Sequence, residues 1–429
     1  MSHSPAHRAR RFWTMLGLVV AGEAVFALPF HIARFFRPSV LEVFQLSNTE
    51  LGAAQGVYGI MAMLAYFPGG PLADRFPARK LMAASLWCTA AGGLYMSTFP
   101  GFRGALLLWG LFGVSTILLF WAALIRATRE WGGTDRQGQA YGLLDGGRGL
   151  LAAVLATLAV GVFGLAFPEG YAAAGESDRR EALRIIILGY TAATALAGML
   201  VWFVIRDGGE NSASGRWNRG GESAAAHIGR TLKIPAVWLQ SVIIVCAYVG
   251  YKGFDNYSLY AVQGYGLDEV DAAAVAAMGA WMRPVAALFA GLLGDRLGVG
   301  RMTLATFLLL LASHLVFALD TPSTATTWLL FGNTLVTCAA IFGLRGLYFA
   351  LFQEARVPLA LTGTAVGLVS VVGYTPDIFV AWFGGMLLDR SPGLAGHQDY
   401  FTFLAAFSLA GVVASAAMLR LLARQNRAV

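Results

Sequence analysis

The chain has 429 residues and a formal net charge of +7, with 57% hydrophobic and only 13% charged residues. Soluble globular proteins carry about 25% charged residues, so this composition excludes a soluble fold and predicts an integral membrane protein. The basic residues are spread over short loops and form no single patch, which excludes a nucleic-acid-binding surface.

Long apolar runs follow one another along the whole chain, and each is close to the roughly 20 residues that a membrane-spanning helix needs. They cover residues 12–36, 51–70, 81–99, 104–125, 139–167, 183–205, 234–261, 272–293, 302–319, 326–350, 360–388 and 400–422. The stretch 206–233 is rich in Gly, Ser and Arg, which is typical of a flexible linker. We therefore expect an all-α membrane protein of about 12 transmembrane helices. Two six-helix bundles, 1–205 and 234–429, would flank a cytoplasmic linker at 206–233.

The distribution of Lys and Arg predicts the orientation. Basic residues are concentrated in every second loop, at 75–80, 126–136, 206–233 and 296–301, and at both ends of the chain. The positive-inside rule places these segments and both termini in the cytoplasm of a bacterial inner membrane. No cleavage site follows the first basic residues, so the first helix is expected to be a signal anchor. Cys88, Cys246 and Cys338 stand singly in apolar runs, so we expect no disulfide, metal site or other cofactor.

An internal repeat relates the two halves. GGPLADRFPARK (69–80) aligns with AGLLGDRLGVGR (290–301), and GQAYGL (138–143) aligns with GTAVGL (363–368). Two matches at nearly the same offset indicate parallel repeats, a plan in which transporters hold their site between the halves.

Each copy of the longer repeat contains Gly-x-x-x-Asp-Arg followed by a basic residue, and on this pattern the chain resembles the major facilitator superfamily. The resemblance implies two six-helix bundles that rock about a central cavity, and a gating role for the matched residues. These residues are Gly70, Asp74, Arg75, Lys80, Gly291, Asp295, Arg296 and Arg301. A carboxylate at such a helix end can bind a neighbouring helix N-terminus and an arginine when the cytoplasmic side is closed. The alternative is a solvated turn that obeys the positive-inside rule.

Within the superfamily, HIARFFRP (31–38) is similar to the basic segment of the organophosphate–phosphate antiporters and of related organic anion symporters. The antiporters grip phosphate with an arginine of helix 1 and a basic residue of helix 7. Arg34 matches the first position and Lys252 the second. The chain departs from the antiporters because position 252 is Lys and the fifth run has no histidine. The resemblance therefore implies handling of an anion and leaves phosphate open.

Charged residues inside apolar runs are costly and usually line a pathway. The candidate substrate contacts are Arg34, Lys252, Arg345, Arg283 and His31. The alternative is that these residues pair with buried acids or snorkel to the membrane surface, as we expect of Arg37.

Buried acids are the candidates for carrying a proton, because a carboxylate in an apolar cavity binds protons more tightly. These candidates are Glu23, Asp377 and Asp145. Asp145 and Arg148 are three residues apart, as are Asp255 and Lys252, so each pair shares a helix face and can form an ion pair.

The sequence thus predicts a monomeric secondary transporter that moves a small organic anion by alternating access, through proton coupling or exchange. Carboxylate, phosphate and sulfonate all remain open as the anionic group, because Lys and Arg bind each of them. The alternative is a receptor or assembly factor that uses the same fold without transport. An enzyme is not expected, because the sequence has no metal-ligand cluster or nucleophile elbow.

Overall fold

The computed structural model describes residues 5–133, 136–205, 229–348, 350–355 and 359–427, and these residues form helices and no strand. Ten of the described helical stretches are long and apolar enough to cross a membrane. Helices α4 (Asn48–Arg75), of 28 residues, and α5 (Ala78–Met96), of 19 residues, are not counted among these ten. The all-α membrane architecture is therefore confirmed, and the number of about 12 spanning helices stays a prediction. Residues 206–228 of the expected linker lie outside the described residues.

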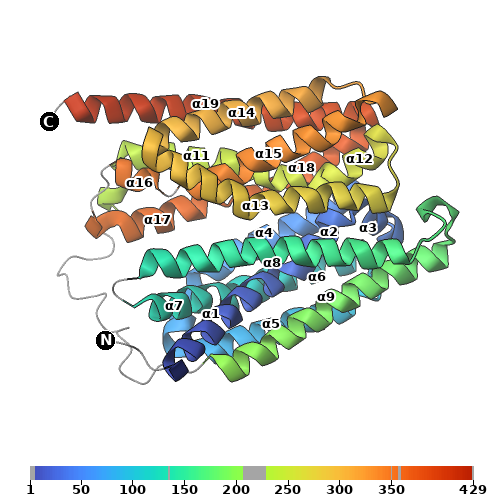
Figure 1. Cartoon of the computed structure of the whole chain (residues 1–429), viewed down its shortest axis with the longest axis horizontal. Helices are drawn as coiled ribbons and strands as arrows, with labels where there is room; N and C mark the ends of the chain where they lie inside the picture. Colours follow the sequence, from blue (N-terminus) through green and yellow to red (C-terminus); the bar gives the residue numbers. More distant parts are fainter. Residues whose placement is uncertain (1–4, 134–135, 206–228, 349, 356–358, 428–429) are drawn as a thin grey trace.

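The first half contains helices up to residue 204 (Figure 1). Besides α4 and α5, they are α1 (Pro5–Phe26), η1 (Ala27–His31), α2 (Ile32–Phe35), α3 (Arg37–Phe44), α6 (Phe102–Val114), η2 (Ser115–Trp121), α7 (Ala122–Gly132), α8 (Gln137–Leu165), η3 (Tyr171–Ala173) and α9 (Glu176–Val204). The second half contains α11 (Pro235–Gly253), η4 (Phe254–Asn256), α12 (Tyr257–Tyr265), α13 (Glu269–Leu297), α14 (Val299–Leu319), η5 (Thr324–Thr326), α15 (Thr327–Leu347), α16 (Leu351–Glu354), α17 (Leu359–Gly373), α18 (Pro376–Arg390) and α19 (Leu394–Arg427).

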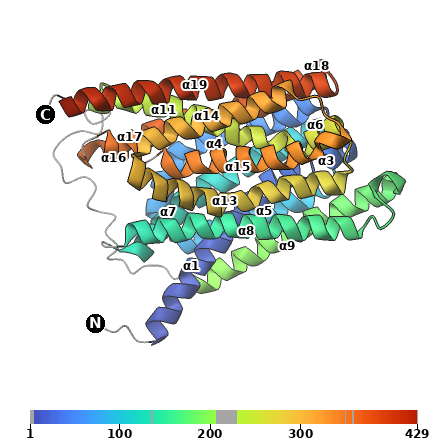
Figure 2. The same ribbon diagram turned by 45° about the horizontal axis from the view of Figure 1, so that its top comes forward.

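Both chain termini lie at one end of the molecule, on the left in Figure 1, which we call the termini end; the opposite end is the far end. Helices coloured blue to green gather in the lower part of that view, and helices coloured yellow to red in the upper part. The two groups meet where α4 packs on α18 and where α8 packs on α13, and Figure 2 shows the second pair side by side. Large apolar side chains such as Leu107, Phe203 and Trp328 are exposed on the outside, where lipid would cover them.

Two membrane-spanning stretches contain a π-helical segment, η1 between α1 and α2 and η2 between α6 and α7. The first membrane-spanning stretch passes from α1 through η1, a π-helical segment that contains Pro29, before it continues as α2. Proline has no backbone N–H, so the regular hydrogen-bond ladder cannot run through it. The indole N–H of Trp109 donates to the carbonyl oxygen of Pro29 at 3.3 Å. Such π segments occur frequently at functional sites, and this one contains Phe30 and His31, which line the central cavity.

Candidate substrate cavity

A cavity of about 140 Å³ lies between the two halves. Aromatic rings from both halves form much of its wall, namely Phe26, Phe30, Phe35, Tyr58, Tyr66, Trp121, Tyr248, Tyr251, Phe254, Phe342 and Tyr374. Charged side chains enter the wall at six positions, which are Glu23, Arg34, Arg148, Arg283, Arg345 and Asp377. The cavity therefore combines an apolar, aromatic body with a small set of charges, as ligand sites in proteins commonly do.

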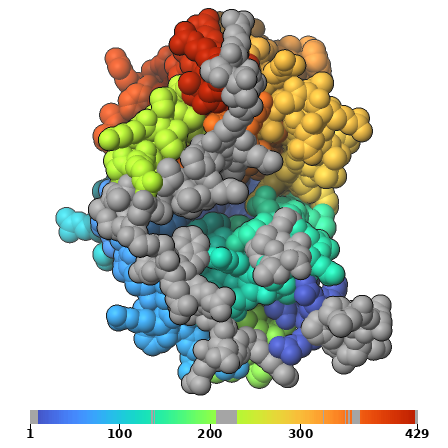
Figure 3. Space-filling model, turned by 90° about the vertical axis from the view of Figure 1, so that its left-hand side faces the viewer, coloured from blue at the N-terminus to red at the C-terminus, as the bar shows by residue number. Residues whose placement is uncertain are grey.

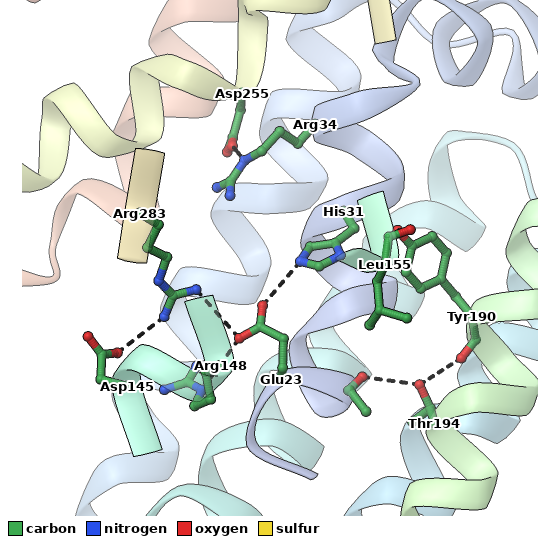
Figure 4. A network of polar contacts seen from close by, with 11 residues as sticks. Glu23, His31, Arg34, Asp145, Arg148, Leu155, Tyr190, Thr194, Asp255 and Arg283 are labelled. Carbon is green, nitrogen blue, oxygen red and sulfur yellow. Dashed lines mark hydrogen bonds and ion pairs between the residues drawn. The ribbon is translucent and has the colours of Figure 1, made fainter. Parts of the chain in front are cut away.

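The first group of charges surrounds Glu23, which is buried on α1 and lies at the centre of Figure 4. One carboxylate oxygen lies 3.2 Å from Nε2 of His31, and the other lies 3.4 Å from Nε of Arg148 and 3.5 Å from Nη1 of Arg283. Arg283 also contacts Asp145 at 3.2 Å, and the Asp145 side chain is 64% exposed. Because Arg283 comes from α13 and its two acids come from α1 and α8, this group joins the two halves.

The second group of charges surrounds Asp255, which is buried in η4. Nε of Arg34 donates to one of its oxygens at 2.5 Å, and Nζ of Lys252 lies 2.8 Å from the other. Lys252 also lies 3.7 Å from Asp377, which accepts a hydrogen bond from the Tyr248 hydroxyl at 3.0 Å. Arg34 comes from the first half and Asp255 from the second, so this pair is also a bridge between the halves.

Arg345, on α15, differs from the other cations of the cavity. Its guanidinium lies 4.2 Å from the ring centre of Tyr251 and 5.7 Å from that of Tyr248, and it makes no ion pair with any acid among the described residues. Its buried Nη1 has no hydrogen-bond partner there either. Each other cation of the two groups contacts at least one carboxylate, so Arg345 carries the unbalanced positive charge of the cavity.

The structure thus gathers most of the predicted binding and coupling residues around one space. Arg34, Arg283, Arg345, His31, Glu23 and Asp377 line the cavity, whereas Lys252 and Asp145 contact these residues from outside its lining. The expected Asp145–Arg148 pair is absent from the described ion pairs, because Arg148 reaches Glu23 instead. Arg37 does not snorkel: it is fully buried, 3.5 Å from the Asn48 side chain, and its Nε and Nη1 have no described partner.

The two halves close against each other at the far end. A Cβ atom added to Gly52 or Gly56 of α4 would lie 2.2 Å from the Ala381 carbonyl oxygen or 2.7 Å from that of Ile378, both on α18. On the second seam, Trp281 of α13 donates to Thr157 of α8 at 3.0 Å. The approach of α4 to α18 leaves no room for a side chain at Gly52 or Gly56, so these two helices are closely packed at the far end.

Asp389, the second-last residue of α18, fastens this contact. Its two carboxylate oxygens accept hydrogen bonds from the backbone N–H groups of Asn48 and Thr49, at 3.2 and 2.7 Å, and from both side chains, at 3.1 and 2.6 Å. A carboxylate is stabilised there by the positive end of the α4 dipole. The sequence reading missed Asp389, although GGMLLDR (384–390) repeats the pattern of GGPLADR (69–75) and carried the necessary signal.

The predicted gating residues lie at the termini end, which is open in this structure. Asp74, Arg75, Lys80, Asp295, Arg296 and Arg301 are all exposed. Gly70 and Gly291 would meet nothing within 4 Å if they carried a Cβ atom. Figure 3 faces this end and shows recessed surface between the two colour groups beside the grey atoms. The contacts expected of Asp74 and Asp295 belong to a closed termini end, so they stay a prediction.

Comparisons with known proteins agree with this architecture. The family model described as Major Facilitator Superfamily matches residues 19–381. The inner membrane protein YihN of Escherichia coli is 25% identical over 97% of this chain and 98% of its own length, and YqcE of the same organism is 27% identical over 92% and 91%. A bacterial homologue of the human lysosomal transporter Spinster, solved in an inward-facing and unoccupied conformation, superposes with a TM-score of 0.77 at 13% identity, covering 99% of both chains. The nucleoside transporter NupG superposes with a TM-score of 0.68 at 13% identity, covering 95% of this chain and 99% of its own. The chain belongs to the Major Facilitator Superfamily.

Proposed function

We propose that this protein is a secondary transporter of the inner membrane that carries a small organic anion by alternating access. The observation that carries the proposal is Arg345, a cation that faces the central cavity without an acidic partner among the described residues. An ionised group away from bulk water is costly unless an opposite charge compensates it. An anion in the cavity would supply that compensating charge.

The dimensions and walls of the cavity favour a small solute. Its volume of about 140 Å³ lies below the roughly 300–1,000 Å³ of pockets for drug-sized ligands. Tyr251 and Tyr248 stack on the Arg345 guanidinium and hold it in place, so the cation needs little rearrangement on binding. A carboxylate, phosphate or sulfonate head would bind Arg345, and the aromatic wall would contact the rest of the solute.

The same cavity contains the groups that would couple transport to a driving force. Glu23 binds His31, Arg148 and Arg283, and Asp377 binds Tyr248 and Lys252. Protonation of either acid would release cations that the substrate could then bind. Proton symport through Glu23 or Asp377 and exchange against a second anion are the two mechanisms that this arrangement serves.

Uptake and counterflow in proteoliposomes, over a panel of small carboxylates, phosphates and sulfonates, would test the proposal. Arg345→Gln should weaken substrate affinity about tenfold or more, because a charge-assisted contact contributes roughly 1.5–3 kcal/mol. Arg345→Lys should recover part of the affinity if a single point charge suffices, and little if the contact is bidentate. Arg103→Gln, which removes an exposed arginine at the far end, is the matched control.

Two results would count against the proposal. Unchanged affinity in Arg345→Gln would exclude the anion contact, and binding without uptake by the native protein would favour the receptor alternative. The same vesicles separate the coupling mechanisms. If Glu23 carries the proton, Glu23→Gln should lose pH-driven accumulation and keep counterflow; the same holds for Asp377→Asn. Native behaviour of both variants would leave exchange as the mechanism.

A further inference from the structure

A second cavity, of about 420 Å³, lies at the termini end and is separate from the central one. It is formed by the start of α1, the junction between α4 and α5, and the last turns of α7. Its charged lining residues are Arg10, Arg11, Asp74, Arg75, Arg126 and Glu130. Four arginines face two acids, so the cavity has an excess of positive charge that the substrate pathway does not use.

Two of the four arginines are fixed by neighbours, and two are free to bind. Arg126 donates to Glu130 at 3.0 Å and to the Ala73 carbonyl oxygen at 2.5 Å. Arg11 donates to the Trp131 carbonyl oxygen at 3.1 Å and stacks 4.4 Å from its ring centre. Arg10 and Arg75 are exposed and have no acidic partner among the described residues.

Exposed aromatic residues surround this end of the first half. Phe12 is 62% exposed, Trp13 51%, Phe76 49% and Phe203 80%. Trp side chains such as Trp13 are enriched where the hydrocarbon core of a membrane meets the headgroups, and the exposed Phe side chains present apolar surface to the lipid beside it. The second cavity therefore lies at headgroup depth, beside the ends of helices α1, α4 and α7.

We propose that this second cavity binds a phosphate group. Guanidinium groups present paired N–H donors that match phosphate oxygens, and Trp131 offers an apolar floor for whatever the phosphate carries. Basic pockets between membrane helices at this depth bind the headgroups of anionic lipids. A phosphodiester of an anionic phospholipid and a free phosphate in solution share this chemistry, and the experiment distinguishes the two sources.

The test uses the full-length protein purified in detergent. Native mass spectrometry would count bound dimyristoyl phosphatidylglycerol, with phosphatidylcholine as the zwitterionic control. Thermal unfolding with sodium phosphate, against sodium chloride at matched ionic strength, would measure binding of free phosphate. The double variant Arg10→Gln/Arg75→Gln removes both free cations. Arg103→Gln/Arg180→Gln removes two exposed arginines of the far end and is the matched control.

The double variant should bind phosphatidylglycerol at least about tenfold more weakly than the native protein, whereas the control should bind like the native protein. Arg10→Lys/Arg75→Lys keeps both charges but loses the paired donors, so it should bind more tightly than the Gln double variant and more weakly than the native protein. Such partial recovery would show that the loss in the Gln double variant is not a folding defect. Stabilisation by sodium phosphate at low concentration would assign the site to a soluble phosphate. Native binding by the Gln double variant, or equal binding of phosphatidylcholine, would overturn the proposal.

Discussion

At the scale of single residues, the central charges are unequal in importance. Asp255 neutralises two cations at once, Arg34 at 2.5 Å and Lys252 at 2.8 Å, and all three side chains are buried. Removing one partner of a buried ion pair leaves an uncompensated charge, which costs about 3–5 kcal/mol. Asp255→Asn should therefore lower the free energy of unfolding by about that amount, whereas Lys252→Gln should lower it much less because Arg34 still neutralises Asp255.

Thermal or denaturant unfolding in detergent measures this difference. The double variant Lys252→Gln/Asp255→Asn should be more stable than Asp255→Asn alone, because it also removes the cation that Asp255 neutralised at 2.8 Å and costs only the longer 3.7 Å contact with Asp377. Glu181→Gln, which breaks an exposed pair with Arg184, is a control that should change stability by less than about 1 kcal/mol. Equal losses in Lys252→Gln and Asp255→Asn would show that Asp255 is not the shared partner.

The sequence could predict some of these residues and not others. The spacing of Lys252 and Asp255 predicted their contact, because residues three apart share a helix face. It could not predict Arg34 against Asp255, since that contact depends on how two distant helices pack. Arg345 was one cation among four candidates, and only the placement of the acids distinguishes it from the others.

At the scale of elements, the seam between α4 and α18 depends on glycine. A Cβ atom at Gly56 would lie 2.7 Å from the Ile378 carbonyl oxygen, and backbone atoms cannot move aside as a flexible side chain can. We predict that Gly56→Val forces the far end apart and populates a state that is open there. Gly161→Val on α8 is the control, because its Cβ atom would meet nothing within 4 Å.

Spin labels at Arg103→Cys and Arg390→Cys, in a background without the three native cysteines, would report the opening as a longer distance in Gly56→Val. Both positions are exposed and lie on different halves. An unchanged distance in Gly56→Val, with the protein folded, would mean that the seam accommodates a side chain without opening.

Helix positions were largely predictable from apolar runs, but helix irregularities were not. The run 12–36 contains α1, η1 and α2, and the run 104–125 contains α6 and η2 within one membrane-spanning stretch. A π segment keeps the same apolar composition as its neighbours, so the pattern of residues does not reveal it. Helix ends extend past the runs, as in α19 (Leu394–Arg427), because polar residues continue the helix into the headgroup region.

At the scale of the whole molecule, the repeat and the fold were predictable from the sequence, whereas which end of the molecule is closed was not. The sequence predicts two related halves, but which end is closed depends on a small energy difference between two arrangements of the same helices. In this structure the central bridges Arg34–Asp255 and Arg283–Glu23 join the halves, and Asp389 fastens the far end. The two bridges lie between the ends, and we propose that the halves rock about them during transport.

The similarity between GGPLADR and GGMLLDR then has a consequence for the transport cycle. Asp389 caps α4 of the opposite half at the far end, and Asp74 ends the same pattern at the termini end, where it is exposed. We predict that the two carboxylates stabilise opposite states, each by capping a helix of the other half only when its own end is closed. Asp389→Asn should then favour opening of the far end, and Asp74→Asn should favour the state seen here. A carboxylate contact of roughly 1.5–3 kcal/mol would change the ratio of the states by about tenfold or more.

Because each substitution destabilises a different state, their effects on the equilibrium should oppose each other, and the double variant should return close to the native ratio. The Arg103/Arg390 labels measure the far end, and labels at Arg136→Cys and Arg420→Cys, both exposed, measure the termini end. Asp389→Asn should lengthen the far-end distance and shorten the termini-end distance. Asp74→Asn should do the reverse. A double variant with the distances of Asp389→Asn alone would mean that Asp74 contributes nothing to the closed termini end. The change between the two open states would then depend on Asp389 and the central bridges. The GGPLADR motif that contains Asp74 would serve only to fix the orientation of its loop.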